Sequence, residues 1–128
     1  MRYFDHTLRI LWGLHYLVFG LNKLIIFQPV SASNAFAQTV IDSFYATGYL
    51  MQTVGIIQFI SGLLITFNRY MNLAILLALP ITFNILLYTC FTTNFSANAL
   101  ATATLVIFAN GYFIFKRKGQ LAFLLNKN

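Results

Sequence analysis

LAILLALPITFNILLYTCFT, residues 73–92, is a run of about 20 residues that contains no charged side chain. An α-helix needs about 20 apolar residues to cross the hydrocarbon core of a bilayer. Two runs of similar length lie at residues 8–27 and 48–67, and a slightly shorter one lies at residues 98–115. The sequence therefore predicts an all-α, polytopic membrane protein built as a four-transmembrane-helix bundle.

The composition agrees with one compact membrane domain. The chain has 128 residues, of which 59% are hydrophobic and 8% are charged, far from the values of a soluble domain. The short connections after the second and third helices favour antiparallel neighbours. We expect a single domain over residues 1–128, with membrane helices at 7–27, 47–67, 73–93 and 98–115.

The longer first connection contains a pattern of its own. Phe36, Val40 and Phe44 recur every four residues after Ser33 or Asn34, either of which could cap a helix. This spacing predicts a short amphipathic helix at the membrane interface in the first outer loop. It could be a connector resting on the membrane or a lid folded over the bundle.

Positive charge is concentrated on one side of the predicted topology. Four spans place both termini and the turn at residues 68–72 on the same side, which holds every Lys and Arg except Lys23. This asymmetry predicts cytoplasmic N- and C-termini. It explains the net charge of +6 by topology and by contact with the lipid bilayer, without a nucleic acid partner. The predicted cytoplasmic basic anchors include Arg69, Lys116, Arg117 and Lys118.

Polar side chains lie near the centre of three of the apolar runs, namely His15, Gln58 and Asn84. Polar groups at that depth are costly unless they face partners, a cavity or a ligand. They could bind the polar head of a lipophilic molecule such as a quinone, or they could join the helices by hydrogen bonds. Asn22 and Lys23 form a second candidate ligand-binding pair. Lys23 could bind an anionic group, pair with Asp42 or extend to the lipid head groups.

Small residues mark the expected helix contacts. Gly55 and Gly62 share one face of the second predicted helix with Gln58, and Ala103 has a similar place in the fourth. Such faces allow close approach of a neighbouring helix. There are more of them than one bundle requires, so a homodimer is an additional hypothesis.

Catalytic and metal-binding patterns are absent from the sequence. His6 and His15 fall on opposite faces of one helix, which disfavours haem ligation, and no carboxylate lies in the apolar runs to join His15 at a metal. Cys90 is the only cysteine, and no paired carboxylates or nucleophile–base pair can be found. We therefore name no catalytic residue and do not expect an autonomous enzyme.

Several runs in order resemble the DoxX-like family of small four-helix bacterial membrane proteins. They are RILWGLHYLVFGLNKL, ATGYL and IIQFISGLLITFNRYMNLAILLALPITFNILL, together covering about residues 8–93. The resemblance implies a bacterial cytoplasmic (inner) membrane location. Members often have glutamate at the position of Gln58 and histidine at that of Thr89, so this chain departs from the pattern at both. The family pattern carries over to Gly20, Asn22, Lys23, Gly62, Arg69, Pro80 and Asn84.

Some members of that family resemble accessory subunits of membrane oxidoreductases. The resemblance therefore implies an integral membrane accessory or assembly subunit, attached to a membrane redox complex and holding a quinone or a lipid in a polar midplane pocket. Two alternatives remain open at this point. One is a quinone-linked oxidoreductase subunit with direct ligand chemistry, and the other is a small-molecule transporter.

Overall fold

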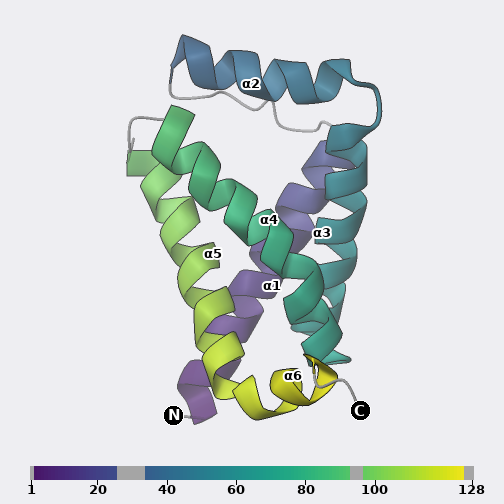
Figure 1. Ribbon diagram of the computed structural model, residues 1–128, viewed down its shortest axis with the longest axis vertical. Coiled ribbons are helices and arrows are strands. Elements are labelled where there is room, and N and C mark those ends of the chain that lie inside the picture. The colour runs from purple at the N-terminus through teal and green to yellow at the C-terminus, as the bar shows by residue number, and fades with distance from the viewer. Residues whose placement is uncertain (1, 26–33, 93–96, 126–128) are drawn as a thin grey trace.

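In the computed structural model, the described residues, 2–25, 34–92 and 97–125, fold into helices alone (Figure 1). The prediction of an all-α fold is confirmed. The six helices are α1 (Arg2–Leu24), α2 (Ala35–Ala46), α3 (Leu50–Thr66), α4 (Met71–Thr92), α5 (Ala97–Lys116) and α6 (Lys118–Leu125).

Four long helices, α1, α3, α4 and α5, form the bundle at nearly the predicted positions. α1 begins at Arg2, earlier than the predicted residue 7, because its first turns pack against α5. There Asp5 accepts a hydrogen bond from Tyr112 and pairs with Lys116. The predicted ends at residues 27 and 93 lie outside the described residues. α6 was not predicted, and the chain turns into it directly after Lys116.

α1 and α3 make the most extensive helix contact in the molecule, and glycines make it possible. A Cβ atom added at Gly62 would lie 3.0 Å from the carbonyl oxygen of Gly13, and one added at Gly20 would lie 3.0 Å from that of Gly55. The two backbones therefore touch at two levels, one heptad apart on each helix. Any larger residue at these positions would push the helices apart.

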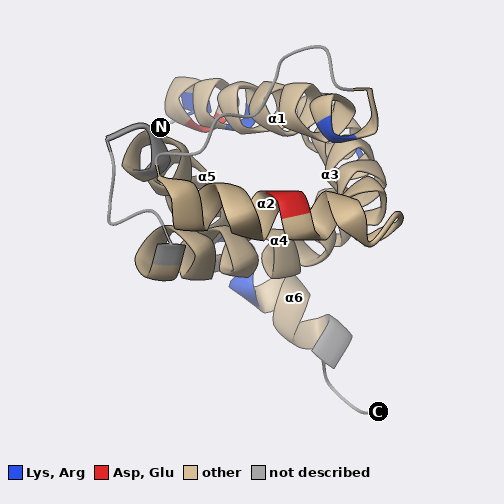
Figure 2. Ribbon diagram, turned by 90° about the horizontal axis from the view of Figure 1, so that it is seen from above, with Lys and Arg blue, Asp and Glu red and all other residues tan. Residues whose placement is uncertain are grey.

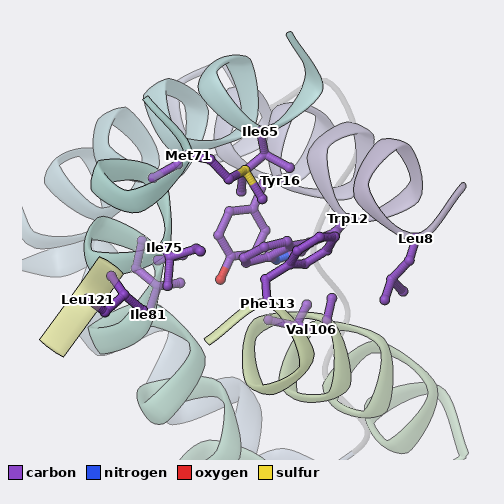
Figure 3. Packing of buried hydrophobic residues seen from close by; sticks show 13 residues of the cluster. Leu8, Trp12, Tyr16, Ile65, Met71, Ile75, Ile81, Val106, Phe113 and Leu121 are labelled. Atoms are coloured by element: carbon purple, nitrogen blue, oxygen red, sulfur yellow. The ribbon is translucent and has the colours of Figure 1, made fainter. Parts of the chain in front are cut away.

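The buried core lies mainly among α1, α4 and α5, and Ile65 of α3 and Leu121 of α6 join it (Figure 3). The Trp12 indole is stacked on Phe113 at a centroid distance of 5.8 Å and meets the Tyr16 ring edge-on. Small residues of α4, Ala74 and Ala78, are fully buried beside these rings. Alternation of large and small side chains lets the rings of α1 and α5 fit against α4.

A buried polar network also crosses this core. The Tyr16 hydroxyl lies 3.0 Å from Thr82 Oγ1, and Asn110 Nδ2 donates to the same oxygen over 2.8 Å. The network therefore joins α1, α4 and α5 through Thr82, whose hydroxyl bonds both Tyr16 and Asn110. Such bonds fix the rotation of each helix about its axis, because an unmade buried hydrogen bond is costly.

α2 lies across one end of the bundle, nearly perpendicular to α3, with a bend of 90° between them (Figure 1). Asn34 is its N-cap, since Asn34 Oδ1 accepts a hydrogen bond from the Ala37 amide over 2.8 Å. The view along the bundle shows α2 passing over its end and α6 extending from the opposite end to one side (Figure 2). A helix in the first connection is thus confirmed. Of the predicted apolar series, Phe36 is 62% exposed, whereas Val40 and Phe44 are partly buried and the smaller Ala37 is fully buried.

One helix within the described ranges is by itself long and apolar enough to cross a membrane, over Met71–Phe91 in α4. α2 and α3 reach that length and composition only as a bent pair. The apolar part of α5, Leu100–Lys116, is shorter. The charged residues Arg9 and Lys23 lie within α1.

Candidate functional site

A cavity of about 530 Å³ lies beneath α2, where α1, α3 and α4 diverge. Its volume falls within the roughly 300–1,000 Å³ of typical small-molecule sites. α2 forms one wall through Ile41, Phe44 and Tyr45. The remaining apolar lining comes from the bundle helices and includes Phe19, Leu50, Met51, Val54, Ile57, Leu77, Ile81 and Ile85.

Lys23 is the one charged side chain among the described residues of this lining. Its ammonium donates to Gln58 Oε1 over 2.9 Å and makes a longer contact of 3.5 Å with the Phe19 carbonyl oxygen. Gln58 is almost completely buried, whereas Lys23 is half-buried. An ammonium has three N–H donors, and these two contacts leave one to be directed at a guest.

The close contact of α1 and α3 positions this pair. Gly55 lies one helical turn before Gln58, and a Cβ added at Gly55 would come within 2.9 Å of Lys23 Cβ. With a glycine there, the Lys23 stem can cross α3 and bring its ammonium to the amide of Gln58. The same small residues that join α1 and α3 therefore also position Lys23, the one cation among the described residues of the lining.

Asn84 lies on the opposite wall, one turn after Pro80, and both residues are exposed at the rim of the cavity. Pro80 is inside α4 and lacks an N–H group, so the helix loses one internal hydrogen bond there. Asn22 also lines the cavity and is 8% exposed. The lining thus contains four of the five candidate ligand-binding residues: Asn22, Lys23, Gln58 and Asn84.

His15 is the fifth candidate, and the structure does not place it in the cavity lining. It is half-buried, with its ring 4.3 Å from the ring of Phe19. His15, Gln58 and Asn84 were grouped by their similar depth in three helices, but depth does not fix rotation about the helix axis. The described residues contain no ion pair between Lys23 and Asp42, and Asp42 instead accepts from Gln38 Nε2 over 2.9 Å.

The other predicted residues have separate positions. Gly55 and Gly62 lie in the α1–α3 contact, and Ala103 is 4% exposed in α5. Among the basic residues, Arg69 is exposed in the turn between α3 and α4, and Lys118 Nζ lies 4.8 Å from the Phe115 ring centroid. Lys116 and Arg117 line a second hollow at the opposite end of the molecule from α2.

Tyr45 is a polar residue of the cavity that the sequence pattern did not reveal. Its hydroxyl is buried and has no hydrogen-bond partner among the described residues. Loss of water contact raises the pKa of Tyr45, so the hydroxyl is a neutral donor at pH 7. The 90° bend between α2 and α3 brings this side chain over the bundle. The sequence does not indicate the angle of that bend.

This arrangement suits the binding of a mostly apolar guest with one polar end. The ammonium of Lys23 and the hydroxyl of Tyr45 can donate hydrogen bonds to a carbonyl or carboxylate oxygen, while the apolar walls surround the remainder. The described residues contain no group of three His, Cys, Asp or Glu side chains that could hold a metal ion.

No protein-family model, curated protein or solved structure matches this chain. The DoxX-like resemblance therefore stays a prediction made from sequence motifs. The cavity and its lining carry the functional interpretation.

Proposed function

We propose that this chain is a four-span membrane protein that holds a quinone or a lipid in the cavity beneath α2, as an accessory or assembly subunit of a membrane redox complex. The observation that carries the proposal is the Lys23–Gln58 pair in a mostly apolar cavity. Burial of a cation at that position is unfavourable in free energy, and contacts with a bound polar head group would offset this cost.

The exterior of the bundle supports the membrane location. On α1 the exposed side chains Leu11, Leu14, Val18 and Leu21 recur at spacings of three and four residues, which forms a continuous apolar stripe. α4 exposes a similar series, including Leu73, Leu76, Leu79, Phe83 and Leu87. Soluble monomers rarely expose apolar surface of this extent, whereas lipid-facing helices do so as a rule.

The distribution of charge supports the proposed orientation. Arg2, Arg9, Arg69 and Arg117 all lie near the end opposite to α2, where the termini are also found (Figure 1). Cytoplasmic termini would place α2 and the cavity in the outer half of a bacterial inner membrane. α2 would then be the predicted interfacial helix, and it would cover the bound molecule from the outer surface.

The polar groups of the lining favour holding the guest over transforming it. Gln58, Asn22 and Asn84 carry amides, which neither accept nor release protons near neutral pH, and Lys23 faces no carboxylate within the lining. General acid–base catalysis needs a titratable pair in reach of the substrate. An accessory subunit that positions a quinone or lipid beside a catalytic partner requires only the contacts seen here.

Native mass spectrometry of the protein after gentle extraction from its own membrane tests this proposal. We expect a retained lipid-soluble molecule, and we expect Ile57→Trp to reduce its occupancy at least roughly tenfold by filling the cavity. Ile56→Trp is the matched control, because the neighbouring Ile56 is 49% exposed and does not line the cavity. Equal occupancy in the two folded variants, or no guest in the wild type, would contradict the proposal. The same spectra report any partner subunit that remains bound.

Lys23→Met tests the role of the ammonium at nearly constant side-chain length. We expect the affinity for the extracted guest to fall about tenfold or more, because a charge-assisted hydrogen bond to its polar end is lost. Lys118→Met is the control, since Lys118 lies at the other end of the molecule over Phe115. Rebinding of the extracted molecule to delipidated protein measures both. An unchanged affinity in Lys23→Met would remove Lys23 from the site.

A further inference from the structure

A second hollow, of about 390 Å³, lies at the end of the bundle opposite to α2, and we call it the basic recess. It is formed by the first turns of α1 and by the junction of α5 and α6. Among the described residues, four cationic side chains line it, together with a single carboxylate, that of Asp5. The four cations are Arg2, Arg9, Lys116 and Arg117.

Two of these cations are held in place by neutral acceptors. Arg9 Nη1 donates to the carbonyl oxygens of Ile65 and Thr66 over 2.7 Å and 2.5 Å. Arg117 Nη1 donates to Asn72 Oδ1 over 3.1 Å and to Gln120 Oε1 over 3.2 Å. These bonds fix the direction of each guanidinium and leave its charge uncompensated.

The one carboxylate of the recess is already engaged. Asp5 pairs with Lys116 and accepts the hydroxyl hydrogen of Tyr112. The charges of Arg2, Arg9 and Arg117 therefore have no anionic partner among the described residues that line the recess. Bringing three cations together without a counter-charge is unfavourable, and a bound anion would reverse that cost.

We propose that the basic recess binds a phosphate group. Guanidinium groups form strong, directional hydrogen bonds with phosphate oxygens, and two oriented guanidiniums can contact one phosphate from two sides. Basic pockets between membrane helices on the cytoplasmic side are suited to anionic lipid head groups. The phosphate can come from the head group of an anionic phospholipid or from free phosphate in solution, and both offer the same chemistry. The recess is separate from the cavity beneath α2, so a negative binding result at one site does not contradict binding at the other.

Trp12 provides a local signal for the test. It is the only tryptophan of the chain, and its indole is stacked on Phe113, a residue that lines the recess. The full-length protein in a non-ionic detergent is titrated with short-chain phosphatidylglycerol, with short-chain phosphatidylcholine and with inorganic phosphate, while Trp12 fluorescence is recorded. We expect a saturable change with phosphatidylglycerol or with inorganic phosphate.

Two double variants, each of which loses two positive charges, distinguish binding in the recess from non-specific electrostatic attraction of the anion to the basic protein. Arg2→Gln with Arg117→Gln removes two lining cations, and we expect at least roughly tenfold weaker binding. Arg69→Gln with Lys118→Gln removes two cations that do not line the recess, and we expect binding to be retained. Circular dichroism checks the fold of both, and Arg2→Gln alone serves if the first pair is misfolded, because Arg2 is exposed.

Each outcome bears on the proposal. Saturation by phosphatidylglycerol alone identifies a lipid head group as the source, and saturation by inorganic phosphate identifies free phosphate. The proposal is overturned if neither anion saturates the signal, if phosphatidylcholine binds as well as phosphatidylglycerol, or if both double variants weaken binding equally.

Discussion

Gly62→Ala is expected to lower the free energy of unfolding by about 1–3 kcal/mol, although it adds a single methyl group. The new Cβ would lie 2.8 Å from the backbone nitrogen of Leu17 and 3.0 Å from the carbonyl oxygen of Gly13. Backbone atoms cannot rotate away as a flexible side chain can, so α1 and α3 must separate along their contact. Chemical denaturation in mild detergent, followed by circular dichroism, measures the change.

The same substitution at Gly111 should have the opposite sign. A Cβ at Gly111 meets no atom within 4 Å, and this residue lies within α5. Alanine is favoured over glycine in a helix by roughly 0.5–1 kcal/mol, so Gly111→Ala should stabilise the protein. Destabilisation by Gly111→Ala, or tolerance of Gly62→Ala, would show that backbone contact between α1 and α3 does not limit the stability.

Arg9→Met is expected to cost roughly 2–3 kcal/mol of stability. The last carbonyl groups of a helix lack a partner within the helix, and Arg9 donates to two of them at the end of α3. They are the carbonyl oxygens of Thr66 and of Ile65, and the latter also accepts from the Asn68 amide. Methionine retains much of the apolar stem but cannot donate to these oxygens. The same denaturation experiment gives the value.

Arg2→Met is the control for this prediction. It removes the same kind of charge from the first turn of the same helix, but Arg2 is exposed, and no hydrogen bond joins it to the carbonyl groups of Ile65 or Thr66. Its expected effect lies within about 0.5 kcal/mol, as for most surface substitutions. Equal losses in the two variants would assign the effect to net charge and would contradict the capping role of Arg9.

The long helices could be predicted from the sequence because long apolar runs between polar turns leave few alternatives. Gly55 and Gly62 on one face of the second predicted helix indicated a close helix contact, but the sequence did not show that α1 is the partner, through Gly13 and Gly20. α6 was missed because KGQLAFLL is short and its first residues are polar. Its position depends on the hydrogen bonds that Asn72 makes with Arg117 and with Gln120, which are long-range in sequence.

The candidate site could be predicted only in part for a related reason. Position along a helix can be read from the sequence, which placed Gln58 and Asn84 at a similar depth, and both line the cavity. Asn22 and Lys23 were predicted as a separate pair, and the structure brings Lys23 to Gln58. Rotation about the helix axis is decided by packing, and it leaves His15 outside the cavity lining, although its ring contacts that of Phe19, which does line the cavity. Tyr45 enters the lining through the bend between α2 and α3, and its neighbours in sequence gave no indication of that bend.

The contact between α1 and α3 also sets an order of events during synthesis. α1 is complete at Leu24, but its glycine-bearing face has no partner until α3 is complete at Thr66, about 40 residues later. At typical translation rates this delay is roughly 2–8 s, far longer than a helix needs to form. During that interval Gly13 and Gly20 of α1 have no packing partner, and another helix nearby could contact them instead of α3. The nascent chain is therefore most exposed to wrong pairing before its second long helix arrives.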